Sequence, residues 1–193
     1  MRGLTKLLLV AAITLTASQW SEAGMIRAKA WLAPILIERA WTDSQTHDVN
    51  VKPWPWADTW PVARLLVPRL DIEQFVLAGA NGASLPFGPG HIAASSLPGA
   101  AGTIAVAGHR DTHFAFLDRL TAGDVVVLEG RDGRRHRYRV RERMIVDSRT
   151  NAMQLGDQAE HLLLVTCEPT SALSARGPWR LVVAAAGIGT TYD

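Results

Sequence analysis

From about residue 61 the chain is a succession of short apolar runs, and this pattern constrains its fold more than any other feature. Each run is rich in Val, Ile and Leu, and Gly, Pro, Asp or Asn separates it from the next. Such runs between turn residues are typical of β-strands. The seven runs cover residues 62–70, 72–80, 103–108, 124–130, 137–146, 162–167 and 179–187. They predict an all-β domain, a barrel or a sandwich, with short helical pieces only near residues 114–120 and 151–157.

One hairpin is strongly marked, because Asp132-Gly133 separates two of these runs. Its second strand carries arginine at every second position from Arg135 to Arg143. On a strand these five arginines share one face. The simpler interpretation is a solvated outer face, and the functional interpretation is contact with phosphate or with an acidic partner protein.

The N-terminus has the layout of an export signal. Residues 1–6 carry two positive charges and no acid, and residues 7–17 are uncharged and mostly apolar. Ser21-Glu22-Ala23 is suitable for the end of a cleaved signal. The apolar run is shorter than the roughly 20 residues of a membrane span, but with residues 18–20 it can act as an uncleaved anchor. We therefore expect export and interpret residues 1–24 as a signal peptide or a signal-anchor.

Residues 25–60 are expected to join this segment to the domain. The pattern of residues 25–42 favours a helix, kinked at Pro34, and a Trp- and Pro-rich linker follows. We expect Trp54, Trp56 and Trp60 to dock onto the domain at residues 61–193. That domain can build a real core, since 48% of the chain is hydrophobic. The net charge of +2 is no sign of a nucleic-acid partner.

The single cysteine, Cys167, stands at the end of the apolar run 162–165. Exported proteins usually have paired cysteines or none. A lone thiol forms no internal disulfide, so two interpretations remain open. Cys167 is either a small buried apolar residue or a nucleophile held at a strand end where a substrate can reach it.

The other reactive candidates also stand at strand ends. His109 follows the run 103–108 and can act as a general acid or base near neutral pH. His91 and His113 are its rivals. Asp111 could orient a histidine or cap a helix that starts near Thr112.

A cation is available at the start of the last run. Arg180 follows Trp179, and a fixed guanidinium beside a reacting carbonyl could stabilise developing negative charge. Arg176 is a weaker competitor. Each of these residues has a structural alternative: a strand-end histidine is often structural, and an arginine here is often only a surface charge.

The order of these segments resembles the sortase family over roughly residues 61–186. Gly-His-Arg follows a strand, an apolar run leads into Thr-Cys, and an arginine follows on the next strand. The resemblance implies a closed, sortase-type β-barrel of about eight strands with short helices, preceded by an N-terminal membrane-targeting helix. It also implies that Cys167 is the nucleophile, His109 the general acid/base and Arg180 the group that holds the substrate backbone or the oxyanion.

Three further residues have supporting roles by the same resemblance. Thr166 matches the Thr of the family's Thr-Cys pair and could help to shape the oxyanion site, while Arg110 and Asp111 follow the histidine as in many sortases. The implied enzyme is a cysteine transpeptidase that cleaves a C-terminal Leu-Pro-x-Thr-Gly-like motif between Thr and Gly through a thioacyl intermediate. It then transfers the protein to an amine, with no cofactor and no metal.

More narrowly, the segments "WPWADTWPVARL", "LPFGPGH", "AGHRDTHF" and "LLLVTCEP" resemble the proteobacterial, or Gram-negative, sortase class. That class implies a protein of the cell inner membrane, anchored by its N-terminal segment, with its catalytic domain in the periplasm. One departure is Glu168-Pro169 after the cysteine, because the charge of Glu168 would oppose thiolate formation. Two alternatives remain: a thiol peptidase that uses the same Cys and His with water as acceptor, and a non-catalytic envelope-anchored β-barrel binding module.

Overall fold

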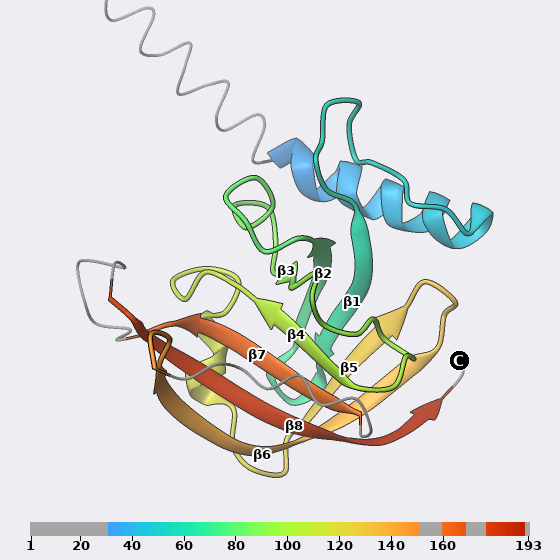
Figure 1. The fold of residues 1–193 in the computed structure, drawn as a ribbon. Helices are drawn as coiled ribbons and strands as arrows, with labels where there is room; N and C mark the ends of the chain where they lie inside the picture. Colours follow the sequence, from blue (N-terminus) through green and yellow to red (C-terminus); the bar gives the residue numbers. More distant parts are fainter. Residues whose placement is uncertain (1–30, 151–159, 169–176, 192–193) are drawn as a thin grey trace, which may run out of the picture. The chain divides into compact units, whose positions relative to one another are not determined.

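A computed structural model of the chain describes residues 31–150, 160–168 and 177–191. The chain divides into two compact units, Met1–Leu36 and Ile37–Asp193. All the strands of the described residues belong to the second unit, and they close into a barrel in the order β1-β2-β3-β4-β7-β8-β6-β5 (Figure 1). The strands are β1 (Pro61–Val67), β2 (Ile72–Ala78), β3 (Gly90–His91), β4 (Thr103–Ala107), β5 (Val125–Gly130), β6 (Arg135–Asp147), β7 (His161–Cys167) and β8 (Trp179–Thr191).

Two of the strand pairings are parallel, and one of them places the candidate site. β2 pairs with β3 and β4 pairs with β7 in parallel, whereas the remaining pairs are antiparallel. The carboxyl ends of parallel neighbours meet at the same edge of a sheet. His109 follows β4 and Cys167 ends β7, so the parallel pairing brings these two parts of the chain together.

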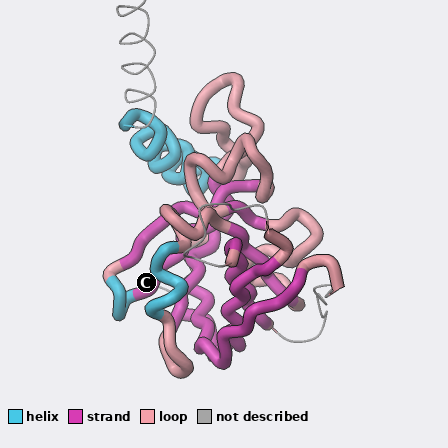
Figure 2. The backbone as a smooth tube through the Cα atoms, turned by 90° about the vertical axis from the view of Figure 1, so that its left-hand side faces the viewer, coloured by secondary structure: helices cyan, strands magenta, loops and turns pink. Residues whose placement is uncertain are grey.

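The core fills the inside of the barrel, because side chains alternate between the two faces of each strand. On β7, for example, Leu162 and Leu164 are buried in the core while Leu163 is only partly buried. Figure 2 shows the strands around this interior. The fully buried side chains of the core include Leu65, Val67, Val76, Ile104, Phe114, Leu117, Leu120, Leu128, Tyr138, Leu162 and Leu164.

All seven predicted runs form strands, and the closed barrel is the predicted fold. The structure adds β3, which is only two residues long and carries no apolar run that a sequence could reveal. The helical piece predicted near residues 114–120 is the 3-10 helix η2 (Ala115–Arg119), and a second one, η1 (Pro68–Leu70), follows β1. The piece predicted at residues 151–157 lies outside the described residues.

The helix before the barrel covers residues 31–47 of the described chain and so continues past its predicted end at Thr42. Trp41 is buried and its ring lies 6.1 Å from that of Phe75 on β2. In the linker, Trp54 packs edge-on against Phe87 at 5.0 Å. The expectation that Trp56 docks is wrong, because this side chain is 79% exposed.

The predicted signal or anchor at residues 1–24 lies outside the described residues. Within the part that the structure describes, no helix has both the length and the apolar character needed to cross a membrane.

Candidate active site

The register between β4 and β7 sets His109 beside Cys167. Ala107, the last residue of β4, pairs with Val165. The alignment continues past the strand, because the Gly108 N–H donates to the Val165 carbonyl at 3.1 Å. His109 lies two residues after Ala107, and Cys167 lies two residues after Val165. The two residues therefore occupy matching positions on neighbouring segments. His109 is exposed and Cys167 is half-buried, so both can be reached from solvent.

The register between β7 and β8 sets Arg180 on the other side of the thiol. Cys167 and Arg180 are direct partners in this antiparallel ladder. Directly opposite residues point to the same face of a sheet, with Cβ atoms about 4.5–5.5 Å apart. His109, Cys167 and Arg180 thus form one row across three neighbouring chain segments, with the cysteine in the middle.

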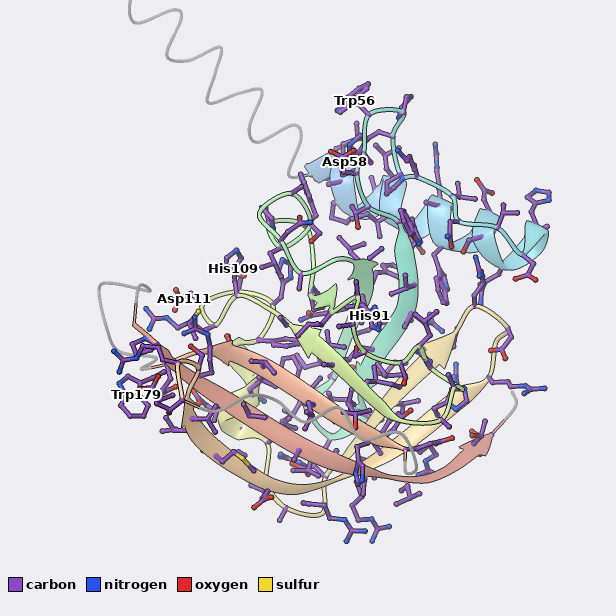
Figure 3. The ribbon with its side chains drawn as sticks, viewed as in Figure 1. Trp56, Asp58, His91, His109, Asp111 and Trp179 are labelled. Carbon is purple, nitrogen blue, oxygen red and sulfur yellow. The ribbon has the colours of Figure 1, made fainter. Side chains whose placement is uncertain are left out.

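The row lies on the outer wall of the barrel. Leu162 and Leu164 point inward, so Leu163, Val165 and Cys167 point outward. Figure 3 shows His109 and Asp111 on the loop after β4, near the start of β8 where Trp179 stands. The side chains on the wall beyond the row are small or apolar: Ala105 and Ala107 on β4, Leu163 and Val165 on β7, and Val182 and Ala184 on β8.

Thr166 joins the two strands that carry the row. Its hydroxyl donates to the Gly108 carbonyl at 2.8 Å, and the residue is 3% exposed. Because neighbours on a strand face opposite sides, this side chain points away from the side of Cys167. A role for Thr166 in the oxyanion site stays a prediction. Its observed contact fixes the residue that precedes His109.

Gly108 permits the chain to pass tightly over Phe114. A Cβ atom at Gly108 would lie 2.7 Å from Phe114 Cγ, a distance that real Cβ contacts do not show. Phe114 is buried in the core and its N–H donates to the His109 carbonyl at 2.9 Å. Nothing in the sequence links Gly108 to Phe114. The Gly-His dipeptide was the only available sign, and it does not reveal the distant ring.

The guanidinium of Arg180 is held by backbone carbonyls. Its Nη1 donates to Gly177 O at 2.7 Å and to Trp179 O at 2.8 Å. An arginine has five N–H donors, and those on Nε and Nη2 have no hydrogen-bond partner among the described residues. They are available to an acceptor near Cys167.

The rival histidines differ from His109 in their surroundings. His91 is 6% exposed, and its Nε2 lies 2.9 Å from Ser96 O, so it is a satisfied side chain of β3. Burial lowers the pKa of His113 below its ordinary value. A hydrogen bond with the Pro86 backbone opposes that shift, and the positive charge of His109 adds to it. A lowered pKa means that a smaller fraction of this histidine carries the second proton at a given pH.

Arg110 and Asp111 interact with each other. Arg110 is buried, and its Nε donates to Asp111 Oδ1 at 3.0 Å, while the Asp111 side chain is 70% exposed. This contact takes the place of the predicted helix cap, because η2 begins only at Ala115. The support that both residues give to His109 stays a prediction. Arg176, the predicted rival of Arg180, lies outside the described residues.

Glu168 directly follows Cys167 and so lies beside the row of His109, Cys167 and Arg180. Its N–H donates to Trp179 O at 3.0 Å, which extends the β7–β8 ladder past Cys167. Its Oε2 is buried and has no hydrogen-bond partner among the residues that the structure describes. In the described ranges, no group of His, Cys, Asp and Glu side chains is arranged to hold a metal ion.

Comparisons with known proteins concern the family and the fold. The family model of the sortase domain matches residues 65–187. The chain is 31% identical over 132 residues to Sortase D of Bacillus subtilis (strain 168), a match that covers 67% of this chain and 64% of that protein. The chain thus spans less than two thirds of the length of that relative.

Solved structures share the fold. A Clostridium perfringens Sortase D5 transpeptidase superposes with a TM-score of 0.66 and 19% identity, covering 82% of this chain and 99% of that one. Sortase A of Listeria monocytogenes gives a TM-score of 0.59 and 22% identity, covering 67% and 88%. These matches do not support the narrower Gram-negative class, which stays a prediction.

Proposed function

Because the chain belongs to the sortase family, we propose that it is a cysteine transpeptidase whose reaction takes place at His109, Cys167 and Arg180. It cleaves a C-terminal Leu-Pro-x-Thr-Gly-like motif between Thr and Gly and transfers the protein to an amine. The observation that supports this most strongly is the row itself. One nucleophile lies between one proton carrier and one fixed cation, each on its own chain segment.

In the first step the Cys167 thiolate attacks the carbonyl carbon of the motif's Thr. The Sγ–C bond forms and the carbonyl oxygen becomes negatively charged, and the free N–H donors of Arg180 stabilise that charge. The C–N bond to Gly then breaks. His109, protonated, gives its proton to the leaving amine, which departs with the C-terminal peptide. The product is a thioester on Cys167.

In the second step an amine attacks the thioester. His109, now neutral, takes a proton from the amine, the new C–N bond forms and the Sγ–C bond breaks, so the Cys167 thiolate is restored. Splitting one difficult step into two is the usual advantage of covalent catalysis. Water in place of the amine would give hydrolysis by the same residues.

The outer wall next to Cys167 suits an extended peptide. Ala107 and Ala184 are small and only partly buried, so they leave space above the sheet, while Leu163 and Val165 offer apolar contact. A motif that contains Leu and Pro has apolar side chains to place on such a wall. We infer that this wall binds the part of the motif that precedes the scissile bond.

We infer the location from the N-terminal sequence. Two cations followed by an apolar run favour export and attachment to the membrane. In the Gram-negative interpretation the membrane is the inner one and the catalytic domain faces the periplasm. The acceptor amine in that compartment is then a substrate to be identified by experiment.

The test uses the full-length protein in detergent, a peptide library built on Leu-Pro-x-Thr-Gly and a panel of amines, with products read by mass spectrometry. Transfer to an amine that disappears in Cys167→Ala supports the proposal. Hydrolysis without transfer under every amine favours the peptidase alternative. A thiol that resists alkylation, together with no product, favours the binding module.

A further inference from the structure

Three arginines on the outer face of β6 have no ion-pair or hydrogen-bond partner among the described residues. Arg137, Arg139 and Arg141 are all exposed. The arginines at the two ends of the same series differ. Arg135 donates to Glu129 Oε2 at 2.9 Å, and Arg143 donates to the Leu120 carbonyl at 3.1 Å. We call Arg137, Arg139 and Arg141 the arginine row.

The neighbours of the arginine row leave its charges uncovered. Across the β6–β8 ladder, Arg137 faces Gly189 and Arg139 faces Ala186. Neither neighbour has a side chain long enough to shield or neutralise a guanidinium. Side chains on one face of a strand repeat about every 6.6 Å, which spaces Arg137 and Arg139. Arg141 stands at a β-bulge, where the β6–β8 register shifts between Val140 and Glu142.

The arginine row borders the same wall that carries Cys167. Ala186 pairs with Arg139 on one side and with His161, the first residue of β7, on the other. A groove of about 510 Å³ lies over this part of the wall. It is lined by Thr103 on β4, Arg141 and Glu142 on β6, His161 and Leu163 on β7, and Ala184, Ala185 and Ala186 on β8. Through Arg141, the groove therefore connects the arginine row to β7, the strand that ends at Cys167.

We propose that the arginine row binds an acidic segment of the substrate protein that lies just N-terminal to the sorting motif. This inference rests on the proposed function. The acyl part of the substrate stays on the enzyme through both steps, whereas the Gly-containing part leaves after the first. A docking surface that serves both steps must hold the acyl side.

Strand geometry gives the position of the acidic residues. With about 3.3 Å per residue along a strand and about 4.8 Å between strands, the arginine row lies roughly 17 to 29 Å from Cys167. An extended peptide covers that distance in about five to nine residues. Asp or Glu five to nine residues before the scissile bond would therefore reach the arginine row.

An anionic lipid surface also attracts arginines, but the groove favours a peptide. A flat bilayer surface does not follow a groove along the wall toward Cys167, whereas an extended chain can. The two partners also differ in what they do to catalysis, since only a bound substrate segment changes kcat/KM between two peptides that share one motif.

The experiment compares two peptides with the same motif and the full-length protein. One carries Asp and Glu at the positions five to nine residues before the scissile bond, and the other carries Ser and Gln there. We expect the acidic peptide to have a kcat/KM about tenfold higher at low salt, mainly through KM, with the advantage shrinking as salt is raised. Arg137→Gln/Arg139→Gln/Arg141→Gln should remove this advantage.

A matched variant removes the same number of exposed cations elsewhere. Arg39→Gln/Lys52→Gln/Arg119→Gln changes net charge equally, and it should keep the advantage of the acidic peptide. Equal kcat/KM for the two peptides in the wild-type protein, or loss of the advantage in both triple variants, overturns the proposal. The proposal is also overturned, in favour of a lipid surface, by one combined result. In that result the protein binds phosphatidylglycerol vesicles through the arginine row and shows no preference between the two peptides.

Binding separates this inference from the proposed function. Fluorescence anisotropy of the labelled acidic peptide is measured with full-length Cys167→Ala, which needs no turnover. Tighter binding of the acidic peptide that disappears with the row substitutions supports the docking surface even if no amine transfer is found. Transfer without that difference in binding leaves the transpeptidase in place and removes the docking surface.

Discussion

Cys167 and Arg180 face each other across the β7–β8 ladder, on the outer wall of the barrel. The arginine is the first residue after Trp179 at the start of its strand, and the backbone carbonyls of Gly177 and Trp179 hold its Nη1. The cation is therefore placed by the same hydrogen-bonded ladder that places the thiol. The two side chains cannot drift apart without breaking the sheet.

This relationship predicts a large effect for Arg180. Arg180→Ala should lower kcat/KM about 10²- to 10³-fold, as loss of an oxyanion donor does. Arg180→Lys should recover little, because an ammonium lacks the planar fork of donors. The measurement is amine transfer by the full-length variants, with Arg119→Ala, an exposed arginine on η2, as the control. Near wild-type activity in Arg180→Ala would remove the residue from the site.

A second prediction concerns the turn that carries His109. Gly108→Ala puts a methyl group 2.7 Å from Phe114 Cγ, and such overpacking costs about 1–3 kcal/mol of the free energy of unfolding. The displaced turn also moves His109, so kcat should fall as well. Urea unfolding and amine-transfer rates measure the two effects. Gly82→Ala is the matched control, because beyond the adjacent residues no described heavy atom lies within 4 Å of the new methyl.

The double variant Gly108→Ala/Phe114→Leu tests the cause, because the smaller side chain relieves the contact. It should recover part of the lost kcat even though Phe114→Leu alone destabilises the core. If kcat stays low in the double variant, the ring contact is not what positions His109.

How far the sequence predicts this site depends on which interactions are local. The β-strands and the strand-end positions of His109 and Cys167 follow from short apolar runs and turn residues. The registers that bring Ala107 to Val165 and Cys167 to Arg180 follow from closure of the whole barrel, and nothing near each residue in the chain encodes them. Only the resemblance to a family assigned the three residues to one site in advance.

The choice among histidines shows the same limit. In the sequence His91 and His113 are rivals of His109, because the surroundings of all three come from distant segments. The carbonyl of Ser96 satisfies His91, and burial lowers the pKa of His113 against the opposing hydrogen bond with the Pro86 backbone. The helix before the barrel ends later than predicted, and the reason is local. The hydroxyls of Thr42 and Thr46 donate to carbonyls one turn earlier, so these polar side chains are satisfied inside the helix, which continues to residue 47.

A third prediction concerns stability at acid pH. Arg69 holds the pKa of Asp124 down at about 2 through a side-chain hydrogen bond, Nη2 to Oδ2 at 2.6 Å, and Thr121 donates to the same carboxylate. An unfolded Asp has a pKa of about 3.9. The unfolded state therefore binds the proton first as pH falls.

The stabilisation from Asp124 is fully present above about pH 4 and is lost as pH falls toward about 2. Asp124→Asn should remove this part of the acid dependence, so the variant loses stability at pH 7 relative to wild type and less at pH 3. Urea unfolding at both pH values measures it. Asp118→Asn, an exposed side chain with no ion pair in the described part of the chain, should not change the slope. An equal loss for Asp124→Asn at both pH values would contradict the prediction.

The last prediction concerns the negative charge beside the thiol. Glu168 follows Cys167, and its buried Oε2 has no hydrogen-bond partner in the described part of the chain. A carboxylate at that position opposes formation of the neighbouring thiolate, and a buried oxygen without a partner costs free energy of folding.

Glu168→Gln removes the charge and keeps the shape. The rate of Cys167 alkylation by iodoacetamide at pH 7 should rise about three- to tenfold, with no loss of thermal stability. Glu38→Gln, an exposed glutamate on the helix before the barrel, should leave the rate unchanged. A slower reaction in Glu168→Gln would mean that the carboxylate helps the thiol, as a proton acceptor or by holding the end of β7 in place.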